Sequence, residues 1–299
     1  MSGTDFERAY RQAAQLVERE LEGCFLEQGP QRELLEAMRY SLLAGGKRLR
    51  PVLTLKVCQA LCGDMEPALD YACAVEMLHT YSLIHDDLPC MDDDALRRGK
   101  PTCHKVYGEC NAVLAGDALQ AEAFRRVAAS NRSAGPAANA RACAVLGRAS
   151  GALAGICAGQ YLDMAGQGRR LDEEELTQIH LWKTAALLQA ACLMGLAASP
   201  VEATPAQQAA VETYARELGL AFQIRDDLLD QQSTTQELGK PVGSDVEQGK
   251  HTFAALYDPE RCQQLVEAHT QRAKQAVADA FGDAEFLCWL ADWLAGRGR

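Results

Sequence analysis

The chain has 299 residues, of which 48% are hydrophobic and 24% charged, and its formal net charge is −11 at pH 7. This length allows a sizeable core, the composition excludes general disorder, and so acidic a surface argues against nucleic acid as a partner. Only 4 Ile and 14 Val accompany many Ala and Leu residues. Strand-forming residues are therefore scarce, and an all-α fold is expected.

The N-terminus and the cysteines bear on the cell compartment. The N-terminal sequence MSGTDFERAY lacks the basic and apolar segments of a secretory signal. The 12 cysteines lie singly in apolar stretches without a CxxC pair, so we interpret them as reduced core thiols rather than disulfides or zinc ligands. The longest apolar run, residues 185–198, is shorter than the roughly 20 residues that cross a bilayer. We expect a cytoplasmic protein without membrane insertion.

Two helices are predicted in the first third of the chain. One begins near Pro30, carries apolar residues at four-residue spacing and ends before Gly45, where basic residues follow at 47–50. The other runs from about residue 65 to 87 and is apolar around most of its circumference, which predicts a buried helix. Its end in carboxylates is unusual for a buried helix.

Two further helices are predicted in the second half. Asp172 and Glu175 have the spacing of a capping box, and the helix that they begin continues through an Ala-rich run to residue 198. Another helix spans residues 204–230. Neither a fixed-period repeat nor a long linker interrupts the pattern, so we expect one domain over residues 1–299, a single large helical bundle.

The first acidic motif, HDDLPCMDDD at residues 85–94, places five aspartates within nine residues. Carboxylates crowded this closely either raise one another's pKa or bind a hard cation such as Mg²⁺, and a solvated acidic helix end is the alternative. The cation site is favoured because the acids continue a helix whose other turns are apolar. Pro89 interrupts that helix and can turn Asp92 back toward the first pair of aspartates.

The second acidic motif is FQIRDDLLD at residues 222–230. Four of its side chains project from one stripe of a helix because of their spacing: Gln223, Asp226, Asp227 and Asp230. A surface ion-pair face is disfavoured because Arg225 is the one nearby cation, and a helix terminus is disfavoured because aspartates belong at helix starts. Two acidic stripes on apolar helices predict a shared cluster of divalent ions that holds phosphate groups.

Basic residues lie beside these motifs in an otherwise acidic chain. Taken singly, each is more often a surface cation. Together they suit a site that holds one diphosphate through metal ions and a second one without, since Arg and Lys bind phosphate oxygens. The set comprises Lys47, Arg48, Arg50, Arg97, Arg98, Lys183, Lys240 and Lys250.

These motifs resemble those of the trans-isoprenyl diphosphate synthase family. DDLPCMDDDALRRGKPT is similar to the family's first aspartate-rich motif with its following RRG, and AFQIRDDLLD is similar to the second, DDxxD. Further segments resemble the family in the same order, so that nearly the whole chain is covered: GGKRLRP, GQYLD, KTAAL, LGKPVGSD and GKHTF. The resemblance implies an all-α bundle around a deep central cavity, usually a homodimer, that condenses an allylic diphosphate with isopentenyl diphosphate.

The resemblance also implies a role for each matching residue. Magnesium ions, three per site, would be held by Asp86, Asp87, Asp92, Asp226, Asp227 and Asp230. The allylic diphosphate would be held by Arg97, Lys183, Lys240 and Lys250, and isopentenyl diphosphate by Lys47, Arg50, His79 and Arg98. The oxygens of Thr184 and Gln223 would stabilise the allylic carbocation. No protein base is implied, since the departing diphosphate takes the proton.

Product length should depend on how deep the apolar cavity extends below Asp86. Tyr81, an aromatic five positions before Asp86, and the two-residue insertion within 88–91 resemble the bacterial farnesyl type. Ser82 is small and leaves the cavity open, with Tyr81 beside it as the barrier, although simple core packing is an alternative for Tyr81. We therefore expect a farnesyl diphosphate synthase with a C15 product.

Three other functions are weighed against this one. A geranylgeranyl diphosphate synthase shares the chemistry and makes a C20 product, but Tyr81 argues against it. A class I terpene cyclase needs only one diphosphate site and typically carries a different second metal motif. A non-catalytic subunit of a heteromeric prenyltransferase would be expected to lack one acidic motif, and both are intact here.

Overall fold

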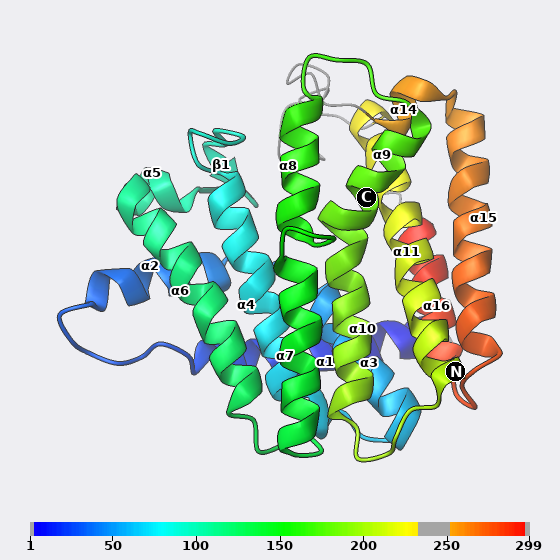
Figure 1. Cartoon of the computed structure of the whole chain (residues 1–299), viewed down its shortest axis with the longest axis horizontal. Coiled ribbons are helices and arrows are strands. Elements are labelled where there is room, and N and C mark those ends of the chain that lie inside the picture. Colours follow the sequence, from blue (N-terminus) through cyan, green and yellow to red (C-terminus); the bar gives the residue numbers. More distant parts are fainter. Residues whose placement is uncertain (1–2, 233–251, 297–299) are drawn as a thin grey trace. The chain divides into compact units, whose positions relative to one another are not determined.

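The computed structural model describes residues 3–232 and 252–296, with the backbone alone for residues 230–232. The described chain is almost entirely helical, so the all-α prediction is confirmed (Figure 1). It divides into two compact units, Met1–Leu146 with Met194–Val201, and Gly147–Leu193 with Glu202–Arg299. Each unit is described by itself below. The single domain over residues 1–299 and the central cavity stay predictions.

The first unit is built around helix α4. Its elements are α1 (Gly3–Glu22), α2 (Arg32–Leu42), α3 (Leu49–Cys62), the 3₁₀ turn η1 (Glu66–Ala68), α4 (Leu69–Asp86), β1 (Leu96–Arg97), β2 (Lys100–Pro101), α5 (Cys103–Tyr107), α6 (Glu109–Ala128) and most of α7 (Pro136–Ser150). Helix α4 is buried around most of its circumference, as its apolar sequence predicts, and it runs beside α6 (Figure 1).

Two local features of this unit differ from the sequence-based expectation. Helix α2 begins at Arg32, so Pro30 lies in the preceding turn rather than in the first turn of the helix. A short hairpin, which the sequence analysis did not predict, pairs Arg97 with Lys100. Its two turn residues have positive φ, 55° at Arg98 and 75° at Gly99, as a tight two-residue hairpin requires.

The second unit contains α8 (Ile156–Gly166), α9 (Glu173–His180), the π-helical turn η2 (Leu181–Ala185), the beginning of α10 (Ala186–Ala198), α11 (Pro205–Gln232), α14 (Phe253–Leu256), α15 (Pro259–Ala278) and α16 (Glu285–Ala295). The predicted capping box is confirmed, because Glu175 N donates to Asp172 Oδ1 at 2.9 Å and Asp172 N donates to Glu175 Oε2 at 3.2 Å. Helix α11 runs beside α15 (Figure 1).

Among the described helices, one continuous stretch, Glu173–Ala198, is apolar and long enough to cross a membrane by length and composition alone. Core helices that never contact lipid pass the same test. Here 56% of the apolar window is buried within the protein. The stretch is therefore weak evidence for a membrane span.

Candidate active site

The first acidic motif forms a turn at the end of α4. The helix ends at Asp86, and the chain turns back through Pro89 until the Asp92 N–H donates to the Asp86 carbonyl oxygen at 2.9 Å. This return confirms the predicted effect of Pro89. Both carboxylates are half-buried, so two oxygen ligands start from one turn of the chain.

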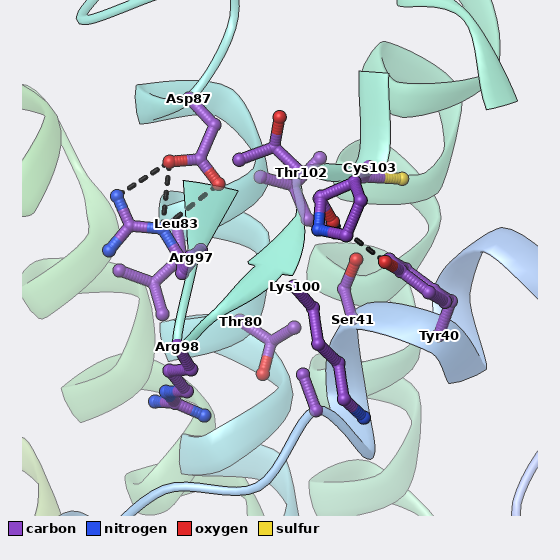
Figure 2. A pocket seen from close by; sticks show the side chains of 13 residues that line it. Tyr40, Ser41, Thr80, Leu83, Asp87, Arg97, Arg98, Lys100, Thr102 and Cys103 are labelled. Atoms are coloured by element: carbon purple, nitrogen blue, oxygen red, sulfur yellow. Dashed lines mark hydrogen bonds and ion pairs between the residues drawn. The ribbon is translucent and has the colours of Figure 1, made fainter. Parts of the chain in front are cut away.

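Asp87, the second aspartate of the pair, is directed to a different partner. It is buried and receives the Arg97 guanidinium from the hairpin, with Nε at 2.7 Å from Oδ1 and 2.9 Å from Oδ2 (Figure 2). Arg97 Nη2 also lies 3.4 Å from Asp94 Oδ2. The structure thus pairs Asp87 and Arg97 with each other, and their predicted roles toward metal and allylic diphosphate stay predictions.

Arg98 points away from this ion pair, as Figure 2 shows. Its guanidinium donates to the carbonyl oxygen of Gly45 in the loop before α3. The loop admits it because Gly46 has no side chain, since a Cβ there would lie 2.5 Å from Arg98 Cζ. Gly46 also has a φ of 122°, which other residues rarely adopt. The GGKRLRP segment and the RRG hairpin are therefore brought together, as a shared anion site requires.

Arg50 and His79 complete a cationic cluster with Arg98. Arg50 Nη1 donates to Nε2 of His79 at 3.3 Å, while Arg50 Nε is enclosed and without a partner within the described chain. Desolvation lowers the pKa of Arg50 to about 10, with Arg98 adding to the shift and Glu76 opposing it. Burial holds the pKa of His79 well below its usual range, and the positive charges of Arg50 and Arg98 lower that pKa further.

This cluster is suited to an anion. Because Arg50 can only donate, Nε2 of the neutral His79 ring is the acceptor, and its Nδ1 carries the proton and can donate to a phosphate oxygen. No carboxylate lies within ion-pair distance of Arg50 among the described side chains, those of residues 3–229 and 252–296. Three of the four residues that the resemblance implies for isopentenyl diphosphate are therefore gathered around one region that lacks a counter-ion.

Lys47 and Arg48 occupy contrasting positions in the same segment. Lys47 is exposed, and its carbonyl oxygen accepts the hydroxyl of Tyr10 at 2.5 Å. Arg48 is buried between two carboxylates of its own unit, so including it among the phosphate-binding cations was wrong. The sequence does not predict the burial of Arg48, because a buried arginine and an exposed one look the same within a basic run.

In the second unit, Lys183 and Thr184 lie on the π-helical turn η2. Such turns are rare in proteins, and those that occur are often found at functional sites. The hydroxyl of Thr184 donates to Gln223 Oε1 on α11 at 3.0 Å, which brings the two predicted carbocation-facing residues together. Lys183 forms an ion pair with Asp163 on α8. Helix α8 can approach the turn because Gly159 lacks a Cβ, which would lie 2.2 Å from Lys183 N.

Asp163 and Gln160 were not predicted as functional residues. Asp163 is the partner of Lys183, and both amide atoms of Gln160 are enclosed without a partner in the described chain. The GQYLD segment that contains them resembles the family and was the signal that could have identified them. A spacing argument does not find Asp163, because its partner Lys183 lies twenty positions away in the sequence.

The second acidic motif divides its paired aspartates as the first one does. Asp226 is half-buried, whereas Asp227 is buried and accepts the Phe253 N–H at 2.9 Å. Asp227 thereby ties α11 to the start of α14. The side chain of Asp230 and the predicted phosphate ligands Lys240 and Lys250 lie outside the described residues.

The residues predicted to set product length lie on α4. Tyr81 is buried, and its ring meets that of His85 edge to face at 5.4 Å. His85 Nε2 lies 3.0 Å from the Val113 carbonyl oxygen on α6, which fixes the imidazole. Ser82 donates to the His79 carbonyl oxygen at 2.8 Å within its own helix. The roles of Tyr81 and Ser82 in product length stay predictions.

Comparison with known proteins gives one consistent family. Residues 31–284 match the family model described as polyprenyl synthetase. The chain is 49% identical over 267 residues to the chloroplastic geranylgeranyl pyrophosphate synthase 3 of Arabidopsis thaliana, covering 88% of this chain and 73% of that protein. It is 42% identical over 271 residues to the farnesyl diphosphate synthase of Geobacillus stearothermophilus, covering 90% of each.

A solved structure gives the same result. The geranyltransferase of Helicobacter pylori, complexed with magnesium and isoprenyl diphosphate, has a TM-score of 0.84 and 31% identity, over 96% of this chain and 95% of that one. The matched region contains both acidic motifs, the basic segment and the residues of η2 described above. The chain therefore belongs to the polyprenyl synthetase family, the trans-isoprenyl diphosphate synthases, and is a prenyltransferase.

Proposed function

We propose that this prenyltransferase is a magnesium-dependent farnesyl diphosphate synthase, which condenses isopentenyl diphosphate with dimethylallyl or geranyl diphosphate. The observation that carries the proposal is the cluster of Arg50, His79 and Arg98, which has no carboxylate within ion-pair distance among the described side chains. A diphosphate site made of two guanidinium groups and a neutral imidazole donor, in a chain that also has two aspartate motifs, suits two diphosphate substrates. A terpene cyclase would need only one.

Magnesium suits the available donors. Within the described residues, no three His, Cys, Asp or Glu side chains converge on one point. Mg²⁺ does not need such a cage, because it is usually bound by one or two carboxylates, waters and the phosphates of the substrate. We assign it to Asp86, Asp92 and Asp226, and we leave Asp87 and Asp227 in their observed contacts with Arg97 and Phe253 N.

The remaining residues bind and orient the substrates. Magnesium, when bound, neutralises charge on the leaving diphosphate. Arg50, His79 and Arg98 hold isopentenyl diphosphate, with Lys47 at the exposed rim. Lys183 supplies a cation for the allylic diphosphate, and its pairing with Asp163 orients the ammonium group.

The allylic cation is stabilised from the second unit. Because Thr184 donates its proton to Gln223 Oε1, the lone pairs of its hydroxyl oxygen remain available to a positive carbon. Fixed oxygen dipoles of this kind stabilise developing charge without reorganisation. We assign no protein base, and the released diphosphate takes the proton after the alkene attacks.

The C15 product is supported by Tyr81, whose ring is buried against His85 below Asp86. A C20 product is the second candidate, because the Arabidopsis relative that is 49% identical is a geranylgeranyl pyrophosphate synthase. The two candidates share every residue assigned above and differ only in the depth available to the growing chain.

The test is a condensation assay. Purified protein is incubated with isopentenyl diphosphate and either dimethylallyl or geranyl diphosphate, with Mg²⁺ or with a chelator, and the dephosphorylated products are sized by chromatography. We expect a magnesium-dependent C15 product. A C20 product would replace the farnesyl assignment, and folded protein that forms no condensation product would overturn the proposal.

The homodimer and the cytoplasmic location that the sequence predicts are also part of this proposal. Exposed apolar side chains on α5 and α6, Val106, Val113 and Leu114, support the homodimer, because a second copy could cover them. Light scattering after gel filtration measures the mass, and a monomer at micromolar concentration would contradict the homodimer.

A further inference from the structure

Arg48 is enclosed in the first unit with every nitrogen bonded. Its Nε donates to Glu18 at 2.6 Å, its Nη1 to Glu76 at 2.6 Å, and its Nη2 to the Leu42 carbonyl oxygen at 2.8 Å. The Arg48 side chain is 1% exposed and that of Glu76 is 3% exposed. The guanidinium is therefore enclosed and out of reach of a substrate, although its neighbours in sequence are candidate diphosphate ligands.

The three bonds join three helices to one loop. Glu18 belongs to α1, Glu76 to α4, and Leu42 ends α2, whereas Arg48 directly precedes α3. Arg48 also has a left-handed backbone with a φ of 53°, a conformation that a residue with a long side chain keeps only where its surroundings enforce it. Such strain marks a position where the direction of the chain matters.

The direction of the chain at this point determines where its neighbours lie. Lys47 precedes Arg48 and is further fixed by the bond from Tyr10 to its carbonyl oxygen. Arg50 follows two positions later and reaches His79. A change in the backbone of residue 48 would rotate Lys47 and Arg50 relative to each other, because a left-handed residue between them sets their relative orientation.

We propose that Arg48 is a positioning residue for isopentenyl diphosphate, acting through the bonds to Glu18, Glu76 and Leu42 rather than by contact with substrate. The inference rests on the function proposed above and deepens it. Glu76 is part of the same device, because its buried carboxylate needs a cation partner. The allylic diphosphate is held by other residues, so its binding should not depend on Arg48 or Glu76.

The charge-conserving variant Arg48→Lys separates position from charge. Lysine keeps one positive charge but lacks the planar fork that makes three fixed bonds. We expect the KM for isopentenyl diphosphate to rise about tenfold, with kcat and the KM for geranyl diphosphate within about twofold, since small displacements of ligands weaken binding strongly. Calorimetric titration with isopentenyl diphosphate should show the same loss of affinity without turnover.

The double variant Arg48→Met with Glu76→Gln separates position from folding. It removes the guanidinium together with the charge of the buried Glu76 carboxylate, and the one carboxylate left without its partner, Glu18, is partly exposed to water. We expect its melting temperature to recover relative to Arg48→Met alone, while its KM for isopentenyl diphosphate stays high. Recovery of both quantities together would show that Arg48 serves stability alone and would overturn the proposal.

The matched control is Arg126→Met. Arg126 is a half-buried arginine of the first unit, paired with Glu20 and Asp70 at 3.0 Å each, and it makes no ion pair or hydrogen bond to the described loop of residues 44–50. We expect it to lower the melting temperature and to leave the KM unchanged. If the wild-type protein condenses its substrates and the KM of Arg48→Lys for isopentenyl diphosphate is unchanged, the positioning role is refuted. If the wild-type protein forms no condensation product, the proposed function itself is refuted.

Discussion

Replacing Tyr81 by alanine should lengthen the product by one isoprene unit. Tyr81 is 7% exposed and lies five residues before Asp86, which places it about 7.5 Å further down the axis of α4. An extended isoprene unit spans about 5 Å, close to the 5.4 Å pitch of a helical turn. Removal of the phenol ring therefore opens room for about one further unit, and C20 should replace C15 as the main product.

The same substitution should destabilise the protein. Loss of a buried aromatic side chain typically costs about 3–5 kcal/mol, and the edge-to-face contact with His85 accounts for about 1 kcal/mol of that. His85 keeps its contact with the Val113 carbonyl oxygen and should hold α4 against α6 in the variant. The assay is therefore run below room temperature, after thermal unfolding has verified that the variant is folded.

Leu83→Ala is the control for nonspecific loosening of α4. Leu83 lies about 200° around the helix from Tyr81, on the side of the small pocket beneath the hairpin (Figure 2). It should lower stability and keep a C15 product. A folded, active Tyr81→Ala variant that still makes only C15, or a Leu83→Ala variant that shifts equally, would refute the assignment of Tyr81 as the barrier.

The second unit yields two further predictions. Although burial opposes ionisation, hydrogen bonds from His269 and Arg272 lower the pKa of Glu217 from 4.5 to about 2. Since the folded pKa lies below the unfolded one, Glu217 contributes about 3 kcal/mol above pH 4.5, and this is lost as the pH falls toward 2. Urea unfolding of Glu217→Gln should therefore differ from wild type more at pH 7 than at pH 3, and an equal difference would contradict this account. Asp226→Asn should lower kcat about 100-fold, whereas Asp227→Asn, which keeps an acceptor oxygen, should change it by less than about tenfold. Steady-state kinetics measure both, and equal losses would make both aspartates metal ligands.

Features that depend on local chain chemistry could be predicted from the sequence. The capping box of Asp172 and Glu175 and the return of Asp92 to Asp86 follow from residue types a few positions apart, and both are confirmed. The buried character of α4 follows from apolar residues on all its faces. In each case the deciding interactions lie within one helix or one turn.

Features that depend on distant partners could not be predicted in the same way. Arg48 and Arg50 belong to one basic run, yet Arg48 is paired with carboxylates about thirty positions away on either side, whereas Arg50 contacts His79. The hairpin at Arg97 was missed because its strands are two residues long and its turn places an arginine at positive φ. The hydrophobic pattern of the sequence predicts neither the partners of the two arginines nor this hairpin.

The paired aspartates show why neighbouring residues of one type need not share a role. Adjacent side chains on a helix diverge by about 100°, so Asp86 and Asp87, and likewise Asp226 and Asp227, cannot point at the same ion with the same ease. In each pair the second carboxylate is buried and binds a group of another element, Arg97 of β1 in one case and the Phe253 N–H of α14 in the other. The first carboxylate of each pair, Asp86 or Asp226, is half-buried. A DD pair can thus be explained as one ligand and one anchor, and the two asparagine variants of the second motif distinguish that arrangement from a pair of ligands.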